Sequence, residues 1–190
     1  MSEEIASIRI VRPRMVYGNQ FGTLYDDDVE FCPAGVAGRY VRWQWRAPYS
    51  VAVLAMGDPS SALLIRNFRH SARREVLEVV KGFGDAERSP AEVARAELSE
   101  ELGFTAHELK FLGVTVADAA FAYQPMHCFL AEGIRDQVPR PEESEAISGA
   151  RAFDLAETPE ALGHGTVEDA VTLSLLWHAY SRWIRTSDEP

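Results

Sequence analysis

One well-marked helix near the middle of the chain limits the folds that are open to it. Ser89 suits the N-cap, Pro90 suits the first helical position, and Glu92 completes a capping box. Gly103 is the residue type that commonly ends a helix. A second helical pattern returns only at residues 166–184. Two helices are too few for the crossovers of a doubly wound parallel sheet, so antiparallel strand pairs are expected.

Strand-forming segments surround that helix. Residues 29–45 contain two β-rich arms around PAGVAG, which is typical of a hairpin. Residues 50–56 and 61–68 bracket GDPS and predict a second antiparallel pair. Further strands are expected at residues 74–80, 109–117, 126–134 and 149–155. This order predicts an α+β fold in layers, with a mixed or mostly antiparallel sheet.

Composition narrows the class of protein. A chain of 190 residues that is 46% hydrophobic can form one domain with a sizeable core and a small appendage. Its net charge of −10 disfavours a nucleic-acid or membrane binder, which would normally carry a basic stripe. Cys32 and Cys128 have neither metal-binding nor disulfide spacing. No apolar run approaches about 20 residues and the N-terminus lacks a signal-peptide layout, so a cytoplasmic protein is expected.

Three carboxylates fall close together on the central helix. Glu97, Glu100 and Glu101 occupy positions i, i+3 and i+4, which share one helix face. That face flanks the apolar stripe formed by residues 94, 98 and 102. Composition alone favours a solvated face, because glutamate-rich helices are common. The other interpretation is a cation site, whose hard oxygen ligands suit Mg²⁺ or Mn²⁺ and not zinc.

The sequence around these carboxylates resembles the signature of the Nudix hydrolases. The stretch GFGDAERSPAEVARAELSEELGF, residues 82–104, matches that signature at the family's spacing. The matching residues are Gly82, Glu97, Leu98, Glu100, Glu101, Gly103 and Phe104. The preceding IRNFR and EVVKGF are similar to the ADP-sugar pyrophosphatase branch. Within that branch, KGFGD and ELSEELGF are most similar to the ADP compounds hydrolases.

The resemblance implies a fold and an assembly. The expected Nudix fold is an α/β/α sandwich around a mixed central sheet, here formed by residues 49–190, with an N-terminal antiparallel hairpin in residues 1–48. By analogy with the branch, the hairpin region would contribute to a homodimer. The expected partner is a small nucleoside diphosphate derivative, and neither a nucleic acid nor a membrane is expected.

Two positions depart from the family signature. Arg88 stands where the family has its first glutamate, and Ala96 stands where it has an arginine. Glu87 and Arg95 lie one place earlier, with the family's separation preserved. This is either coincidence or a retained ion pair, with a one-residue helical bulge absorbing the shift. In the family the glutamate and the arginine at these two positions support the metal ligands. Their replacement here is therefore expected to affect catalytic efficiency more than metal binding.

The resemblance also implies roles in catalysis. Glu97, Glu100 and Glu101 would hold Mg²⁺ or Mn²⁺, with the backbone carbonyl near Gly82 as a further ligand, and Glu101 would also count among the catalytic residues. The branch carries its general base or an extra metal ligand on a late acidic loop. Glu145 aligns best with that position and Glu143 second. The alternative is that this loop is a solvated acidic linker.

Substrate recognition needs cations for the diphosphate and a surface for the base. Arg69 matches the branch's aromatic-arginine motif, and Lys81 directly precedes Gly82. Glu78 would accept a hydrogen bond from a base or ribose. Tyr40 and Trp43 are candidates for stacking on a nucleobase. Their odd spacing along a strand argues against both stacking, and either could belong to the core or to a dimer surface.

Together these features predict a Mg²⁺- or Mn²⁺-dependent pyrophosphohydrolase that acts on ADP-ribose or a related ADP-linked compound. Arg88 and Ala96 keep open a second class of function, a nucleotide-sensing binding module with weak or no turnover. Within the enzyme class, NADH, diadenosine polyphosphates and nucleotide sugars such as GDP-mannose are alternative substrates, because the signature does not select among them.

Overall fold

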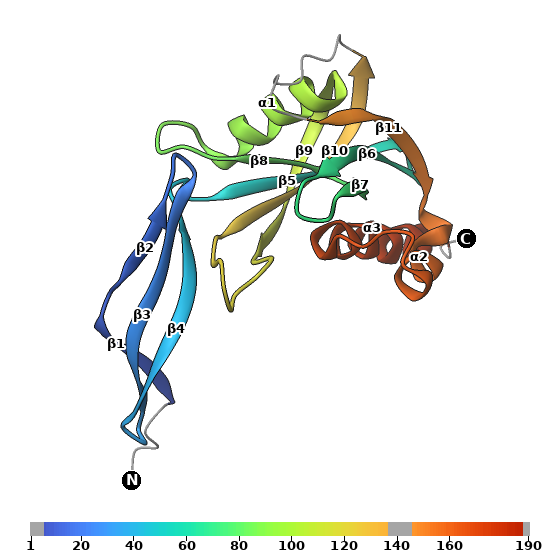
Figure 1. Ribbon diagram of the computed structural model, residues 1–190. Helices are drawn as coiled ribbons and strands as arrows, with labels where there is room; N and C mark the ends of the chain where they lie inside the picture. The colour runs from blue at the N-terminus through green and yellow to red at the C-terminus, as the bar shows by residue number, and fades with distance from the viewer. Residues whose placement is uncertain (1–5, 137–145, 188–190) are drawn as a thin grey trace. The chain divides into compact units, whose positions relative to one another are not determined.

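Two compact units make up the chain in the computed structural model, which describes residues 6–136 and 146–187 (Figure 1). The first unit comprises residues 1–48 and 116–124, and the second comprises residues 49–115 and 125–190. The sequence did not indicate that residues 116–124, which connect two strands of the second unit, would pack with the N-terminal residues.

A seven-stranded sheet forms the centre of the second unit. Its main path runs β11-β6-β5-β10-β9, with β7 paired to β6 and β8 paired to β5. The strands are β5 (Ser50–Asp58), β6 (Ser61–Arg69), β7 (Arg74–Glu78), β8 (Val80–Phe83), β9 (Phe104–Thr115), β10 (Met126–Asp136) and β11 (Ile147–Asp154). The β5–β10 pair is parallel and the other pairs are antiparallel, so the predicted mixed sheet is confirmed.

Helices cover both faces of this sheet (Figure 1). Successive β5 residues point to opposite faces, as strand geometry requires. Val51 and Val53 pack in one hydrophobic cluster with residues of α1 (Pro90–Leu102), and Leu54 packs in another with residues of α3 (Ala170–Ser187). The two clusters confirm the predicted α/β/α layers.

The C-terminal helices differ in detail from the prediction. α3 begins at Ala170, four residues later than expected, because the Asp169 carboxylate caps it by accepting hydrogen bonds from the backbone nitrogen and hydroxyl of Thr172. A 3-10 turn (Leu155–Glu157) and the short α2 (Thr158–His164) were not predicted, because brief helices give little periodic signal. None of the helices in the described ranges is long and apolar enough to cross a membrane.

The first unit contains an antiparallel sheet built on β3 (Gly22–Cys32). β4 (Val36–Trp45) pairs with one edge of β3, which confirms the predicted hairpin. β1 (Ser7–Arg12) and β2 (Met15–Gly18) pair one after the other with the opposite edge and were not predicted. β1 has six residues and β2 has four, so each is too short to give a strong periodic signal, and all their residues are exposed.

Candidate active site

Capping at both ends fixes the helix that carries the three glutamates. The Ser89 backbone nitrogen donates to Glu92 Oε2 at 2.8 Å, and the Glu92 backbone nitrogen donates to Ser89 Oγ at 3.3 Å. At the other end Gly103 has a φ of 69°, a left-handed conformation that favours glycine. These contacts confirm the capping box and the glycine stop that the sequence predicted.

The three glutamates are withdrawn from solvent to different degrees. Glu101 is buried, with 6% of its surface exposed, while Glu97 and Glu100 are half-buried. Glu92, on the first turn of the same helix, is exposed. Gathering carboxylates away from water is costly unless positive charge offsets them. The burial therefore argues against a solvated acidic face and supports a cation site.

Gly82 lies directly against the first of these glutamates. A Cβ atom built on Gly82 would come within 3.0 Å of the carboxylate of Glu97, a separation that real Cβ atoms essentially never show. Gly82 is on β8 and pairs with Val51 of β5. Val51 belongs to the hydrophobic cluster that includes residues of α1. The fold thus brings two of the predicted ligand positions together, and only glycine leaves room for the Glu97 side chain.

The donor set fits a hard divalent cation. The predicted ligands are carboxylate and carbonyl oxygens, which Mg²⁺ and Mn²⁺ prefer. Across residues 6–136 and 146–187, no three or more histidine, cysteine, aspartate or glutamate side chains lie close enough together to hold a metal ion by themselves. Mg²⁺ is usually held by one or two carboxylates together with waters and substrate phosphates, so an open acidic face is compatible with it.

The loop that leads into α1 is held by local hydrogen bonds. Asp85 Oδ1 accepts from the backbone nitrogens of Glu87 and Arg88 at 2.9 and 2.8 Å. The Tyr49 hydroxyl donates to the Arg88 carbonyl at 2.5 Å. The Tyr49 ring also occupies the space where a Cβ on Gly84 would lie. This loop is therefore fixed on the strand side by β5 and on the helix side by its own turn.

Arg88, which replaces the family's first glutamate, is a cation of this loop. Its Nε atom donates to Asp85 Oδ2 at 2.8 Å. The pKa of Arg88 is raised above its ordinary value, chiefly by the hydrogen bond and charge of Asp85 and further by the charges of Glu97 and Glu100. The substitution therefore sets a positive charge beside the acidic face where the family has a negative one.

The one-residue shift of Glu87 and Arg95 is a coincidence of sequence. α1 is a regular α-helix from Pro90 to Leu102 and contains no π-turn. Arg95 is exposed, and its Nη1 atom donates to the Ala106 carbonyl at 3.0 Å. The alternative of a bulged helix with a retained Glu87–Arg95 ion pair is therefore wrong, because the bulge is absent and Arg95 points to another partner.

Three predicted substrate-binding residues lie close together, and their charges are paired with one another. Arg69 Nη2 lies 2.5 Å from Glu78 Oε1, and Lys81 Nζ lies 3.0 Å from Glu78 Oε2. Lys81 Nζ also lies 2.8 Å from Asp169 Oδ1, and only 15% of the Lys81 side chain is exposed. Two cations thus face two carboxylates. Arg69 is the most exposed member and retains access to solvent.

This ion-pair network ties α3 to the strand that leads to Gly82. Thr172 Oγ1 accepts a hydrogen bond from the Val79 backbone nitrogen at 3.0 Å and donates to Asp169 at 2.6 Å. Burial alone would raise the pKa of Asp169, but the Lys81 ammonium and the hydrogen bonds from Thr172 outweigh it and hold the pKa below its ordinary value. Sequence reasoning missed Asp169 and Thr172, although their spacing is that of an N-cap and its third helical residue.

The aromatic candidates lie in the first unit. Tyr40 and Trp43 line one cavity of about 430 Å³, together with Phe121 and Tyr123 from residues 116–124. The Tyr40 hydroxyl donates to the Ala120 carbonyl at 2.9 Å. Both side chains line the same cavity, and whether either stacks on a nucleobase stays a prediction. Phe121 and Tyr123 were missed, since their loop gave no strand or helix signal.

One buried polar atom of the first unit is notable. Trp43 Nε1 has no hydrogen-bond acceptor among the residues that the structure describes. A buried donor without an acceptor is costly to the stability of the fold. The predicted bases, Glu145 and Glu143, lie outside the described residues, and their role stays a prediction.

Comparisons with known proteins identify relatives of this chain. A family model described as the NUDIX domain matches residues 46–173. ADP-ribose pyrophosphatase of Bacillus subtilis is 29% identical over 165 residues, which cover 87% of this chain and 82% of that protein. ADP compounds hydrolase NudE of Escherichia coli is 26% identical over 165 residues, covering 84% and 88%. A crystal structure of an ADP compounds hydrolase superposes with a TM-score of 0.80 at 24% identity, covering 98% of this chain and 99% of that one.

Proposed function

This chain belongs to the Nudix family of hydrolases, and on that premise we propose that it cleaves the diphosphate of ADP-ribose or of a related ADP-linked compound. Water adds across one P–O bond of the bridge: its oxygen joins one phosphorus, and the bridging oxygen leaves with the other. The products are AMP and the phosphorylated second moiety. The names of the two relatives above support this choice of substrate class.

The observation that carries the proposal is the acidic face of α1 against Gly82. Glu97, Glu100 and Glu101 would hold Mg²⁺ or Mn²⁺, with the carbonyl near Gly82 as a further ligand. The chemistry that such an ion supplies is neutralisation of the phosphate charge and activation of water. Glu101, the most buried of the three, keeps its carboxylate fixed for this purpose. Glu145, with Glu143 as second choice, is proposed as the general base.

The chain's own cations would bind the diphosphate. Arg69 remains exposed while paired with Glu78, so it can donate to a phosphate oxygen. Lys81 and Glu78 act in this proposal mainly by holding the strand before Gly82, because each is already engaged. Tyr40 and Trp43, in the first unit, offer aromatic surface to a nucleobase.

We further propose that the protein is a homodimer. Large apolar side chains are exposed along β1 and β2 of the first unit, which is unusual for a surface in contact with water. They are Ile8, Ile10, Val11, Met15, Val16 and Tyr17. A second copy would cover them. Light scattering after gel filtration measures the mass, and Val16→Asp should shift it from dimer to monomer; a wild-type monomer at micromolar concentration contradicts this proposal.

A substrate panel tests the activity. ADP-ribose, NADH, a diadenosine polyphosphate and GDP-mannose are incubated with Mg²⁺ or Mn²⁺, and the released AMP, GMP and phosphate are measured. We expect the highest turnover with ADP-ribose or another ADP-linked compound, and no turnover with EDTA. Preferred release of GMP from GDP-mannose would overturn the assignment of the base, and metal-independent turnover would overturn the assignment of the metal.

Arg88 and Ala96 favour one second candidate, a binding module that senses a nucleotide with weak or no turnover. Its distinguishing result is protection against thermal unfolding by ADP-ribose without any products after long incubation with Mg²⁺ or Mn²⁺. Product formation that is abolished by Glu101→Gln rejects the sensor. The two functions therefore separate in a single pair of measurements on the same preparation.

A further inference from the structure

The chain that leads to Gly82 changes its strand partner at one residue. β7 pairs with β6 up to Glu78, and β8 pairs with β5 from Val80 onward. Val79 lies between the two strands, is fully buried, and its backbone nitrogen donates to Thr172 Oγ1 of α3 at 3.0 Å. A buried backbone N–H is costly to leave without an acceptor. At this crossover the Thr172 hydroxyl therefore supplies the acceptor that a neighbouring strand supplies elsewhere.

The Thr172 side chain is itself held by Asp169. Asp169 Oδ2 accepts hydrogen bonds from the Thr172 backbone nitrogen at 2.8 Å and from the Thr172 hydroxyl at 2.6 Å. A hydroxyl has a single proton, so donation to Asp169 leaves the oxygen lone pairs of Thr172 for Val79. Thr172 is fully buried and Asp169 is half-buried. The first turn of α3 thus presents a fixed acceptor to the strand crossover.

The other oxygen of Asp169 holds the residue next to Gly82. Lys81 Nζ lies 2.8 Å from Asp169 Oδ1. Lys81 is opposite Ala52 in the strand register, and Ala52 belongs to the hydrophobic cluster on the α3 side. Successive strand residues point to opposite faces of a sheet, so Gly82 faces α1 and meets Glu97 there. α3 therefore anchors the strand from one face, one residue before the strand meets the glutamate on the other face.

Little displacement of this strand is compatible with the proposed cation site. The space for a Cβ atom on Gly82 is taken by the Glu97 side chain, so the backbone and the carboxylate are already in close contact. Mg²⁺ demands a near-ideal octahedron of oxygen atoms at about 2.0–2.1 Å. A shift of the strand by a fraction of an ångström would change how the Gly82 carbonyl and the Glu97 carboxylate can share an ion. The affinity of the site should therefore depend on what holds the strand.

We propose that Asp169 and Thr172 are positioning residues of the divalent-cation site. They fix the strand crossover, and with it the Gly82 backbone on which that site is built, without touching the cation or the substrate. The inference rests on the metal site of the proposed function. It adds that the first turn of α3, on the opposite face of the sheet from the glutamates, determines how tightly the cation is bound.

Titration of the full chain with Mn²⁺ tests this role without any turnover. The electron paramagnetic resonance signal of free Mn²⁺ gives the dissociation constant. Thr172→Val removes the hydroxyl without changing the charge, and it should weaken Mn²⁺ binding about tenfold, as expected for a residue that orients a metal ligand. Thr172→Ser keeps the hydroxyl and should bind Mn²⁺ with the affinity of wild type. Equal affinities in wild type and both variants overturn the inference.

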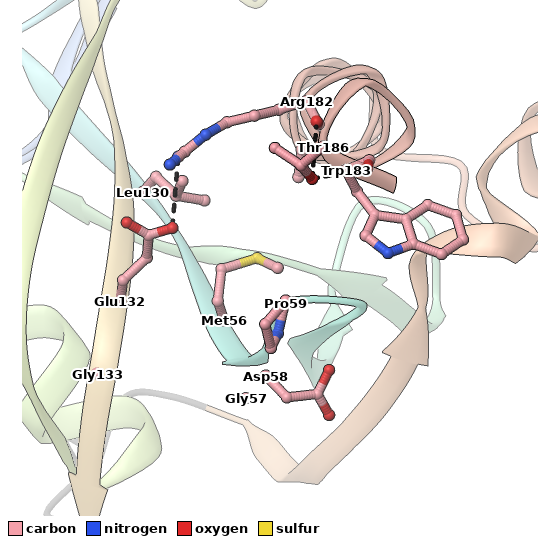
Figure 2. A pocket seen from close by; sticks show the side chains of 11 residues that line it. Met56, Gly57, Asp58, Pro59, Leu130, Glu132, Gly133, Arg182, Trp183 and Thr186 are labelled. Carbon is pink, nitrogen blue, oxygen red and sulfur yellow. Dashed lines mark hydrogen bonds and ion pairs between the residues drawn. The ribbon is translucent and has the colours of Figure 1, made fainter. Parts of the chain in front are cut away.

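Trp183→Leu is the control for a general loosening of α3. Trp183 lies about three turns after Thr172 on this helix, and it lines a cavity of about 450 Å³ together with Met56 and Leu130 (Figure 2). Its replacement should lower the melting temperature and leave the Mn²⁺ dissociation constant unchanged. A loss of folded protein reduces the number of sites and not their affinity. An equal loss of affinity in Trp183→Leu and Thr172→Val would reject a positioning role.

Asp169→Asn is the second test, which remains if Thr172→Val does not fold. It weakens the hold on Lys81 while the Thr172 hydroxyl stays available to Val79, and it should also weaken Mn²⁺ binding about tenfold. Glu168→Gln is the charge-matched control, because Glu168 is the preceding residue and pairs with Arg74 at 2.6 Å. It should leave Mn²⁺ binding unchanged. Equal losses in the two variants would mean that charge alone, and not position, weakens the cation.

Hydrolysis of ADP-ribose on the same preparations separates this inference from the proposed activity. If Mn²⁺ binds and the variants follow the expected order, but no ADP-linked compound is hydrolysed, the positioning role stands and the proposed activity fails. If wild type hydrolyses ADP-ribose and Thr172→Val binds Mn²⁺ as wild type does, the activity stands and the positioning role fails. Absence of Mn²⁺ binding in wild type overturns both.

Discussion

Two acidic segments of this chain carry similar charge and meet different surroundings. On β3 the carboxylates of Asp26, Asp27, Asp28 and Glu30 are matched by arginines from the neighbouring strands. Arg9 lies directly opposite Glu30 in the strand register, and Arg12 directly opposite Asp28. On α1, Glu97 lies against Gly82 and Glu101 is buried. The nearby cation is Arg88, which stands where the family has a glutamate.

The comparison shows which of the two acidic segments could serve as a metal site. On β3 the strand pairing itself supplies the positive charge, so the carboxylates hold the sheet together and need nothing else. On α1 the carboxylates are partly or fully withdrawn from water, and Glu97 lies directly against the Gly82 backbone. The net charge of −10 sums over both segments and distinguishes neither of them.

The largest expected effect is a loss of turnover when a carboxylate of α1 is neutralised. Glu101→Gln should lower Mg²⁺-dependent hydrolysis of ADP-ribose by about 100-fold or more, because even the loss of a residue that supports a metal ligand typically costs 10–100-fold. The change is isosteric, so the melting temperature should move little. Asp28→Asn on β3 removes the same charge and should leave turnover unchanged. Equal activity in Glu101→Gln and wild type would end the metal assignment.

A backbone change on the same side should have the next largest effect. Gly82→Ala places a methyl group on the Glu97 carboxylate, so Glu97 must move. We expect turnover to fall by at least about tenfold and the free energy of unfolding to fall by about 1–3 kcal/mol. Gly163→Ala is the control, because a Cβ there meets nothing within 4 Å. Unchanged kinetics in Gly82→Ala would show that the close contact is unimportant.

Neutralising a carboxylate of β3 should instead lower the free energy of unfolding. Asp27 is 1% exposed, and it accepts from Arg42 Nε at 2.7 Å and from the Arg14 backbone nitrogen at 3.0 Å. Asp27→Asn should lower the free energy of unfolding by about 2 kcal/mol, less than a fully buried pair, because Arg42 is partly exposed. Asp28→Asn, which changes a more exposed pair, should cost less. Urea unfolding measures both, and the reverse order would contradict the pairing.

The contribution of the Asp169 ion pair to stability should depend on pH. Because its pKa is lower in the folded than in the unfolded protein, its ion pair stabilises the fold above the ordinary value of 3.8 and is lost as the pH falls through the folded pKa. Asp169→Asn should therefore cost about 1.5 kcal/mol at neutral pH, and the difference from wild type should shrink below about pH 4. A difference that grows on acidification would give the wrong sign.

The smallest effect sharpens the role of Arg88. Arg88→Glu restores the family's residue type and removes a cation beside Glu97 and Glu100. We expect the Mg²⁺ concentration for half-maximal turnover to fall roughly fivefold, because a positive charge that repels the metal ion is removed. Arg185→Glu makes the same charge change on α3 and should have no such effect. A higher Mg²⁺ requirement in Arg88→Glu would mean that Arg88 serves the substrate instead.

The features that the sequence predicted well are local ones. The caps of α1 lie within a few residues of one another, and the β3–β4 hairpin is formed by adjacent segments, so short patterns suffice to specify them. The features that it missed need distant partners. β1 and β2 are strands only because β3 lies beside them, and Phe121 and Tyr123 meet Tyr40 and Trp43 across about 80 residues of sequence.

By itself, therefore, the sequence determined the capped helix, its three glutamates on one face and the family to which that pattern points. The tertiary structure decided what those side chains meet. It placed Glu97 against Gly82 and paired Lys81 with Glu78 and Asp169. The physical reason is range: helix caps and face periodicity act over a few residues, whereas burial, ion pairing and close backbone approach depend on how distant segments pack.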